Sequence, residues 1–161
     1  MSDTIREIIL QDFISRLAVI TTANGYNTNI GKNVYRVRKA VDPDDLPCCV
    51  IWPGAEKGEA SYGENSCTMP IRIEGIAEFG CENPSVVSEK ILGDLKKCIL
   101  EPGNALAEPP VGWIRSPDYI DSLVYAGGGT DEYPDEEGKT VGAMISVEVK
   151  YTEKIGDPYS Q

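Results

Sequence analysis

The stretch VGAMISVEVKY, from Val141 to Tyr151, places an apolar side chain at every second position. A period of two is typical of a β-strand that has one face in a hydrophobic core and the other in water. A shorter strand-like run, from Tyr119 to Tyr125, precedes it, and a Gly-rich, acidic insert from Gly127 to Lys139 separates the two. Since hairpin connections usually span about two to five residues, the sequence predicts a long C-terminal β-hairpin with an oversized loop.

Three further strands are expected earlier in the chain. One is a continuous apolar run, which predicts burial on both faces and a central place in the sheet. Another is a long alternating run that contains Gly75, which predicts a bulge or a close approach, and Pro70, which predicts an edge position or an irregular start. The expected strands span Val34 to Arg38, Cys48 to Trp52 and Cys67 to Phe79, and the polar segment from Ala55 to Ser66 is expected to be exposed.

Two helices are also expected. The first runs from Ile5 to about Ala23, with Thr4 and Glu7 at the spacing of a capping box. The second opens at the Asn83-Pro84 pair, where an N-cap residue precedes proline at the first helical position, and it stops at a Glu-Pro-Gly sequence. Its apolar residues recur at helical spacing: Val87, Ile91, Leu95, Cys98 and Ile99.

The order of these elements is helix, three strands, helix, two strands. It predicts one α+β domain over residues 1–161, with a mostly antiparallel sheet of about five strands and two helices packed on one face. A chain of 161 residues is long enough to bury a core without disulfide or metal support.

The charge of the chain limits its partners. A formal net charge of -11 argues against tight binding to nucleic-acid phosphates or to anionic membranes, because such binding depends on clustered Lys and Arg. The N-terminal residues do not resemble a secretory signal, and no apolar run approaches the roughly 20 residues that span a bilayer. We therefore expect a soluble protein of the cytoplasm.

The sequence offers little for catalysis. It contains no histidine, which excludes Ser-His-Asp triads, Cys-His pairs and the usual His-containing metal sites. Its five cysteines are odd in number, and Cys48 and Cys49 are adjacent, so buried free thiols are expected rather than disulfides or a zinc site. We expect no catalytic residue, no cofactor and no metal, although paired-carboxylate chemistry stays open.

The candidate functional residues are therefore those of an interaction surface. The acidic insert matches neither a calcium loop nor a phosphate loop, and it is either a solvated charge run or an arm that contacts another protein. The charged outer face of the long strand is either paired across the sheet or part of a contact between subunits. The candidates are Gly128, Asp131, Glu132, Tyr133, Asp135, Glu136 and Glu137 in the insert, and Arg72 and Glu74 on the strand.

The layout of the whole chain resembles a family, the short tail-terminator and tail-completion proteins of long-tailed bacteriophages, including prophage copies. The resemblance is carried by a helix that begins IREII at Ile5, the strands LPCCVI from Leu46 and MPIRIEG from Met69, the helix around Ile91 to Leu95, and the strand from Ala143 to Tyr151.

This resemblance implies a subunit of a hexameric ring that caps the finished tail tube and docks to the head connector. It implies a place in the host cytoplasm or in the virion tail, and it gives no catalytic residues to carry over. Long hairpin arms in such rings often reach a neighbouring subunit, which makes the insert a candidate arm.

Other functions fit the sequence as well. Within the resemblance, a connector-side adaptor or a tail-tube protein stays open. Outside it, the chain could be a carboxylate-dependent enzyme or a small-ligand module with its site between the sheet and the loop from Asp42 to Glu64. A third alternative is an adaptor protein whose acidic face mimics nucleic acid for a basic partner.

Overall fold

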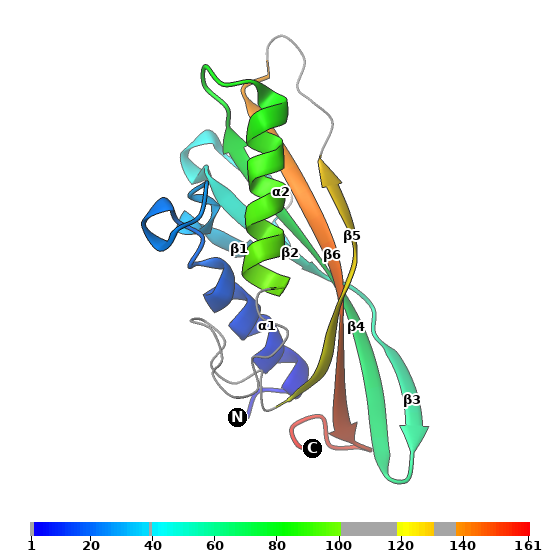
Figure 1. Ribbon diagram of the computed structural model, residues 1–161. Coiled ribbons are helices and arrows are strands. Elements are labelled where there is room, and N and C mark those ends of the chain that lie inside the picture. Colours follow the sequence, from blue (N-terminus) through cyan, green and yellow to red (C-terminus); the bar gives the residue numbers. More distant parts are fainter. Residues whose placement is uncertain (1, 39, 101–118, 131–137) are drawn as a thin grey trace.

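The computed structural model describes residues 2–38, 40–100, 119–130 and 138–161. In these residues six strands form one mixed, largely antiparallel sheet in the order β1-β2-β4-β6-β5, and β3 pairs with β4 (Figure 1). The elements are α1 (Ile5–Leu17), β1 (Val34–Arg36), β2 (Cys48–Pro53), β3 (Lys57–Ser61), β4 (Glu64–Glu78), α2 (Pro84–Leu100), β5 (Ile120–Thr130), β6 (Thr140–Lys154) and the short 3-10 helices η1 (Thr22–Asn24), η2 (Ile30–Lys32) and η3 (Pro43–Asp45). The α+β class is confirmed, and both α-helices lie on the same face of the sheet (Figure 1).

The strands β4 and β6 form the centre of the sheet. Each is 15 residues long, and they pair antiparallel without a break from Glu64 opposite Lys154 to Glu78 opposite Thr140. Every second residue of β6 from Val141 to Tyr151 is buried, as the alternation predicts. This face meets the helices, and the apolar residues of both layers belong to one hydrophobic cluster.

The two helices differ in how well the sequence predicts them. In α2, Asn83 caps the first turn by accepting a hydrogen bond from the backbone N–H of Ser85 (2.9 Å), and the predicted apolar stripe is buried. In α1, Thr4 accepts the capping hydrogen bond from the N–H of Glu7 (3.1 Å). The expected end at Ala23 is wrong, because α1 stops at Leu17, directly before a run rich in β-branched residues that disfavour helix.

The sheet has one strand more than the expected five. The extra strand, β3, lies in the segment predicted to be an exposed loop, and all five of its residues are exposed. It contains no large apolar residue, so the alternation of a half-buried strand could not reveal it. The expected insert also begins too early, because Gly127 to Thr130 continue β5 and pair with β6, whereas residues 131–137 lie outside the described part of the chain.

Pro70 lies in the central strand β4 and not at an edge. Its carbonyl accepts a hydrogen bond from the N–H of Gly54 (2.8 Å), so its missing N–H faces the same side, where β2 has ended and β3 has not begun. Because no ladder hydrogen bond is needed at this point, proline is tolerated inside the sheet.

Gly75 marks a close approach between the sheet and the helices. A Cβ atom built on it would lie 2.6 Å from Cγ2 of Ile91 and 2.9 Å from Cδ1 of Ile30. Of the two predictions for this glycine, close approach is therefore confirmed, since β4 pairs with β6 in unbroken register through this residue.

The described part of the chain contains no helix with the length and hydropathy needed to span a bilayer.

We expect Gly75→Ala to lower the free energy of unfolding by about 1 to 3 kcal/mol, because the added methyl group forces the packed helix side chains to move. Urea denaturation measures this change. The matched control is Gly93→Ala on α2, where nothing lies within 4 Å of the added Cβ. That variant should gain about 0.5 to 1 kcal/mol from helix propensity. Equal stability of the two variants would contradict the packing described for Gly75.

Candidate functional site

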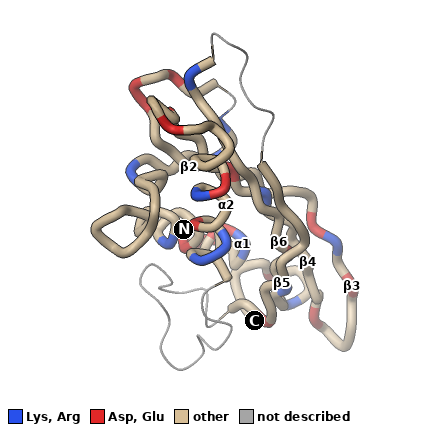
Figure 2. The backbone as a smooth tube through the Cα atoms, turned by 45° about the horizontal axis from the view of Figure 1, so that its top comes forward, with Lys and Arg blue, Asp and Glu red and all other residues tan. Residues whose placement is uncertain are grey.

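A three-stranded extension projects from the sheet beyond the region that the helices cover (Figure 1). It consists of β3, the first residues of β4 (64–68) and the last residues of β6 (150–154), which pair with one another in regular register. We call this extension the arm. It carries charged side chains of both signs, and Figure 2 shows a blue and a red segment on β3.

The tip of the arm is a two-residue turn, Tyr62-Gly63, between the paired residues Ser61 and Glu64. Both turn residues have positive φ (44° and 85°), as the tight turns of β-hairpins require. Asn or Gly normally occupies the first of these positions, because L-residues other than Asn and Asp pay about 1 to 2 kcal/mol for this backbone conformation. Tyr62 occupies it nevertheless, and its side chain is fully exposed.

A second apolar side chain accompanies Tyr62 at the tip. Ile155, directly after β6, is 53% exposed, and its N–H donates to the carbonyl of Gly63 (3.0 Å). This hydrogen bond holds the tip turn against the end of β6, so the aromatic and aliphatic side chains are presented on a supported backbone.

A cluster of ionisable groups lies at the base of the arm. A carboxylate oxygen of Glu56, Sγ of Cys67 and a carboxylate oxygen of Glu153 lie within 4.8 Å of one another. The hydroxyl of Tyr151 donates to Glu56, and Nη1 of Arg6 lies 3.5 Å from the same carboxylate. Since Arg6 belongs to α1, the cluster joins the first helix to the base of the arm.

The environment of this cluster favours the neutral forms of Glu153, Cys67 and Tyr151. Burial, and then the nearby Glu56 carboxylate, raises the pKa of Glu153. Burial also raises the pKa of the Cys67 thiol to about 11 and raises the pKa of Tyr151. Thiol and phenol therefore stay protonated at neutral pH, where they act as donors rather than as nucleophiles.

Glu56, Cys67 and Glu153 are also the residues that could hold a metal ion, through two oxygens and one sulfur. Two features of the cluster oppose this. Arg6 already neutralises Glu56, and a metal would have to displace a proton from a thiol whose pKa is raised. The arrangement is better suited to fixing the arm against α1.

Two of the residues proposed from the sequence for an interaction surface lie on the face of β4 opposite the helices. Nη2 of Arg72 forms an ion pair with Glu74 (2.9 Å), and its guanidinium lies 5.3 Å from the ring centre of Trp52. Arg72 and Glu74 thus have partners within the chain, and their role in a contact between subunits stays a prediction.

The other proposed residues belong to the expected insert. Gly128 is in β5 opposite Ile145. A Cβ atom built on it would lie 2.7 Å from the carbonyl oxygen of Met144, so close packing on β6 leaves room only for glycine at this position. Asp131, Glu132, Tyr133, Asp135, Glu136 and Glu137 lie outside the described residues.

The arm and the cluster at its base were missed by the sequence analysis. The sequence did contain a signal for the arm. Tyr62-Gly63 stands between two polar runs of similar length, residues 57–61 and 64–68, and Gly is common at the second position of a two-residue hairpin turn. No sequence signal gathers Glu56, Cys67 and Glu153, since they come from three separate segments and only the pairing of the strands brings them together.

No protein-family model matches the chain, and a search of curated proteins finds no significantly similar sequence.

We expect Glu153→Gln to raise the melting temperature at pH 7 by about 1 to 3 °C. The folded state disfavours ionised Glu153, and this destabilisation is present above its raised folded-state pKa and absent where the group is protonated. The difference between variant and wild type should therefore shrink as the pH falls towards 4. Calorimetry across this range measures it, with Glu148→Gln, an exposed carboxylate on the same strand, as the control. An unchanged melting temperature at pH 7 would show that Glu153 is not strained in the fold.

Proposed function

We propose that this chain is a structural subunit that assembles with its own copies into a ring, caps the tail tube of a long-tailed bacteriophage and joins it to the head connector. The layout that resembles tail-terminator proteins supports this proposal from the sequence. The structural observation that carries it is Tyr62, a fully exposed aromatic side chain on a left-handed backbone at the tip of the arm.

Tyr62 is unfavourable for this chain in isolation. Its backbone conformation is costly for tyrosine, and its ring gains nothing from the core because it is fully exposed. Tyrosine is among the residues that contribute most to protein interfaces, where it buries a large rigid surface with little loss of conformational entropy. A contact with another molecule accounts for both features.

The arm suits such a contact because it is braced. Three paired strands support the turn, and Arg6 connects the base to α1 through Glu56 and the carbonyl of Gly54 (2.6 Å). A braced element loses little conformational freedom when it binds, so less of the contact energy is consumed in ordering it.

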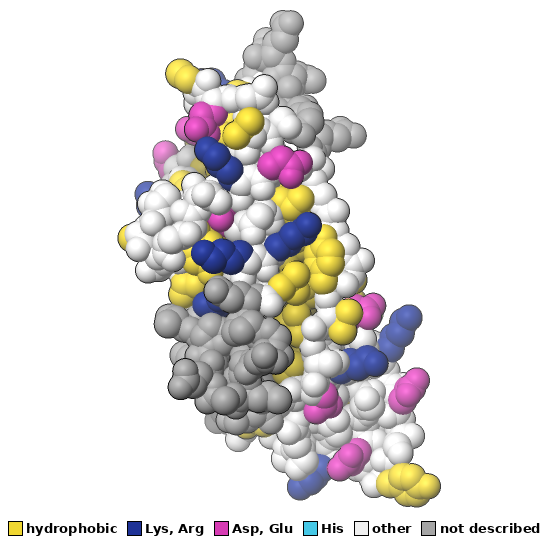
Figure 3. Space-filling model, in the orientation of Figure 1, with side chains coloured by type: hydrophobic (Ala, Val, Ile, Leu, Met, Phe, Trp, Pro, Cys, Tyr) yellow, Lys and Arg dark blue, Asp and Glu magenta, His cyan; other side chains and the backbone are white. Residues whose placement is uncertain are grey.

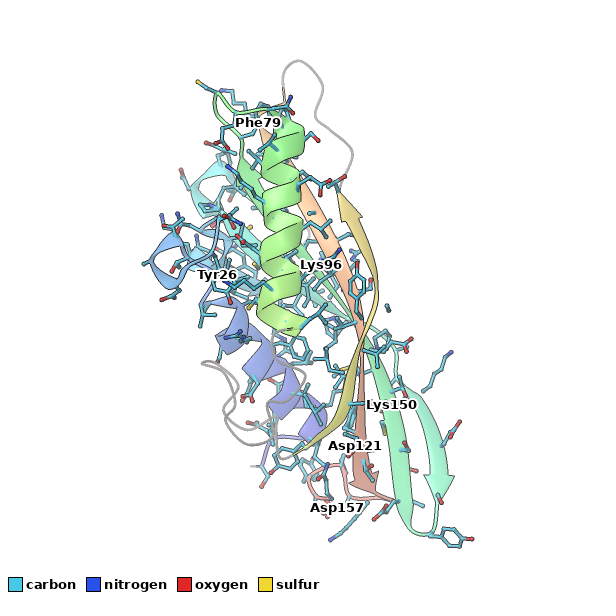
Figure 4. The ribbon with its side chains drawn as sticks, in the orientation of Figure 1. Tyr26, Phe79, Lys96, Asp121, Lys150 and Asp157 are labelled. Carbon is cyan, nitrogen blue, oxygen red and sulfur yellow. The ribbon has the colours of Figure 1, made fainter. Side chains whose placement is uncertain are left out.

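The edge strand β5 offers a further surface for assembly. It is 11 residues long, and its exposed side chains include Val124 and Tyr125, with Lys96 of α2 lying 5.3 Å from the tyrosine ring centre. Figure 3 shows apolar side chains gathered between α2 and β5, and Figure 4 shows Lys96 beside them. Lys and Pro protect many edge strands, and β5 has neither, although two register shifts interrupt its pairing with β6.

The proposal places the protein in the host cytoplasm during assembly and in the virion tail afterwards. The net charge of -11 suits a ring through which DNA passes without being bound tightly, because carboxylates repel phosphates. The proposal requires no catalytic residue and no cofactor.

We expect the wild-type chain to form a hexamer and Tyr62→Asn to shift the population towards monomer. Asn tolerates the left-handed turn better than Tyr does, so the variant should melt at the same temperature as wild type or slightly higher. Light scattering on a sizing column across a concentration series measures the mass. Tyr159→Asn, which removes another exposed tyrosine, is the control and should assemble normally. A wild-type chain that is monomeric at every concentration would refute the proposal.

A further inference from the structure

An open cleft lies at the opposite end of β4 from the arm. It has a volume of about 280 Å³ and is formed by the end of β4, the start of α2, the loop before η2 and the segment around η3. Its lining residues include the apolar Leu46, Pro47, Ala77 and Val87, and the charged Glu78, Glu82 and Lys90.

Hydrogen bonds hold two walls of the cleft in place. The buried carboxylate of Asp94 on α2 accepts from the N–H groups of Asn27 and Thr28 (3.0 and 2.8 Å) and from the hydroxyl of Thr28 (2.6 Å), which fixes the loop before η2. On the other side, Asp45 forms an ion pair with Arg38 (2.8 Å) and accepts from the hydroxyl of Tyr35 (3.0 Å). The cleft therefore exists before anything binds.

The size and chemistry of the cleft suit one large side chain. Its volume is just below the range of roughly 300 to 1,000 Å³ that holds drug-sized ligands. Apolar side chains contribute much of the lining, while Glu82 and Lys90, joined by an ion pair of 3.2 Å, lie beside them. A tyrosine combines an apolar ring with a polar hydroxyl and matches such a lining.

The position of the cleft excludes a contact within one chain. The arm tip adjoins Glu64 at the start of β4, and Glu78 at the end of the same strand lines the cleft. Residues that far apart on a 15-residue strand are separated by about 46 Å, given a rise of about 3.3 Å per residue. Tyr62 can thus reach only the cleft of another copy.

We propose that Tyr62 of one copy inserts into this cleft of the next copy. This inference rests on the proposed self-assembly and names its contact. Each site carries charges of both signs, with Lys154 and Glu64 beside the tip and Glu78, Glu82 and Lys90 in the cleft, so opposite charges can face each other across the contact. Unless a two-fold axis makes the contact reciprocal within a dimer, it is head-to-tail, and head-to-tail contacts close into rings when the rotation between copies permits.

A photo-crosslinking benzophenone amino acid at position 62 tests the contact directly. Isotopically heavy and light copies are mixed and irradiated, and the linked peptides are identified by mass spectrometry. We expect heavy-light pairs that join position 62 to residues 28–29, 43–47 or 77–90 of the other copy. Heavy-light pairs that join it elsewhere would overturn the cleft contact and leave the proposed ring intact. Absence of heavy-light pairs, together with a monomeric wild type, would overturn both.

A complementation experiment tests the head-to-tail arrangement. Tyr62→Asn has an open cleft and no tyrosine at its tip, whereas Leu46→Trp keeps the tyrosine and fills the cleft. Each variant alone should be monomeric, and an equimolar mixture should form a complex of two chains that grows no further. A mixture that stays monomeric would overturn the inference, as would Leu46→Trp assembling like wild type. Thermal melting of Leu46→Trp confirms that it is folded.

Discussion

The unbroken pairing of β4 with β6 organises the whole molecule. One side of β4 carries β2 and then β3, the free side of β6 carries β5, and the shared buried face receives both helices. A shift of this pairing by one residue would turn every apolar side chain of one strand away from the core, so the buried face fixes the register strongly. The same pairing continues past the helices and builds the arm, whose base still contributes Cys67 and Tyr151 to the hydrophobic cluster.

The sequence predicts the elements whose buried residues recur at a regular spacing, and it predicts the exposed ones poorly. The buried face of β6, the stripe of α2 and the close approach at Gly75 follow from apolar periodicity or from a single exceptional residue. The end of α1 did not, because its apolar residues continue beyond the last helical turn into a β-branched run that periodicity alone does not distinguish. The exposed strand β3 left no apolar pattern at all. The functional surfaces were the least predictable, because the cluster around Glu56 and the cleft around Leu46 combine segments that meet only through strand pairing and helix packing.

The sheet thus has two regions, one that the helices cover and one that forms the arm, and they differ in what stabilises them. Where the helices cover it, burial of apolar side chains stabilises the fold, and Gly75 allows the layers to approach closely. In the arm, the sheet is held by backbone hydrogen bonds, by the burial of Cys67 and Tyr151 at its base and by the anchoring of that base to Arg6. Tyr62 and the cleft lie at opposite ends of β4, which gives the subunit a direction, and a directional subunit is what head-to-tail assembly needs.

Pro70 separates these two regions in a way that bears on how such a protein changes over time. It stands where β2 has ended and β3 has not begun, so no hydrogen bond donated by residue 70 is needed there. Insertions in the arm beyond Cys67 and Tyr151, the last buried pair of the ladder, leave the buried register untouched if they come in pairs of residues on each strand, because side chains then keep their faces. The length of the arm can therefore change during evolution in steps of about 7 Å, while the rest of the protein keeps its structure.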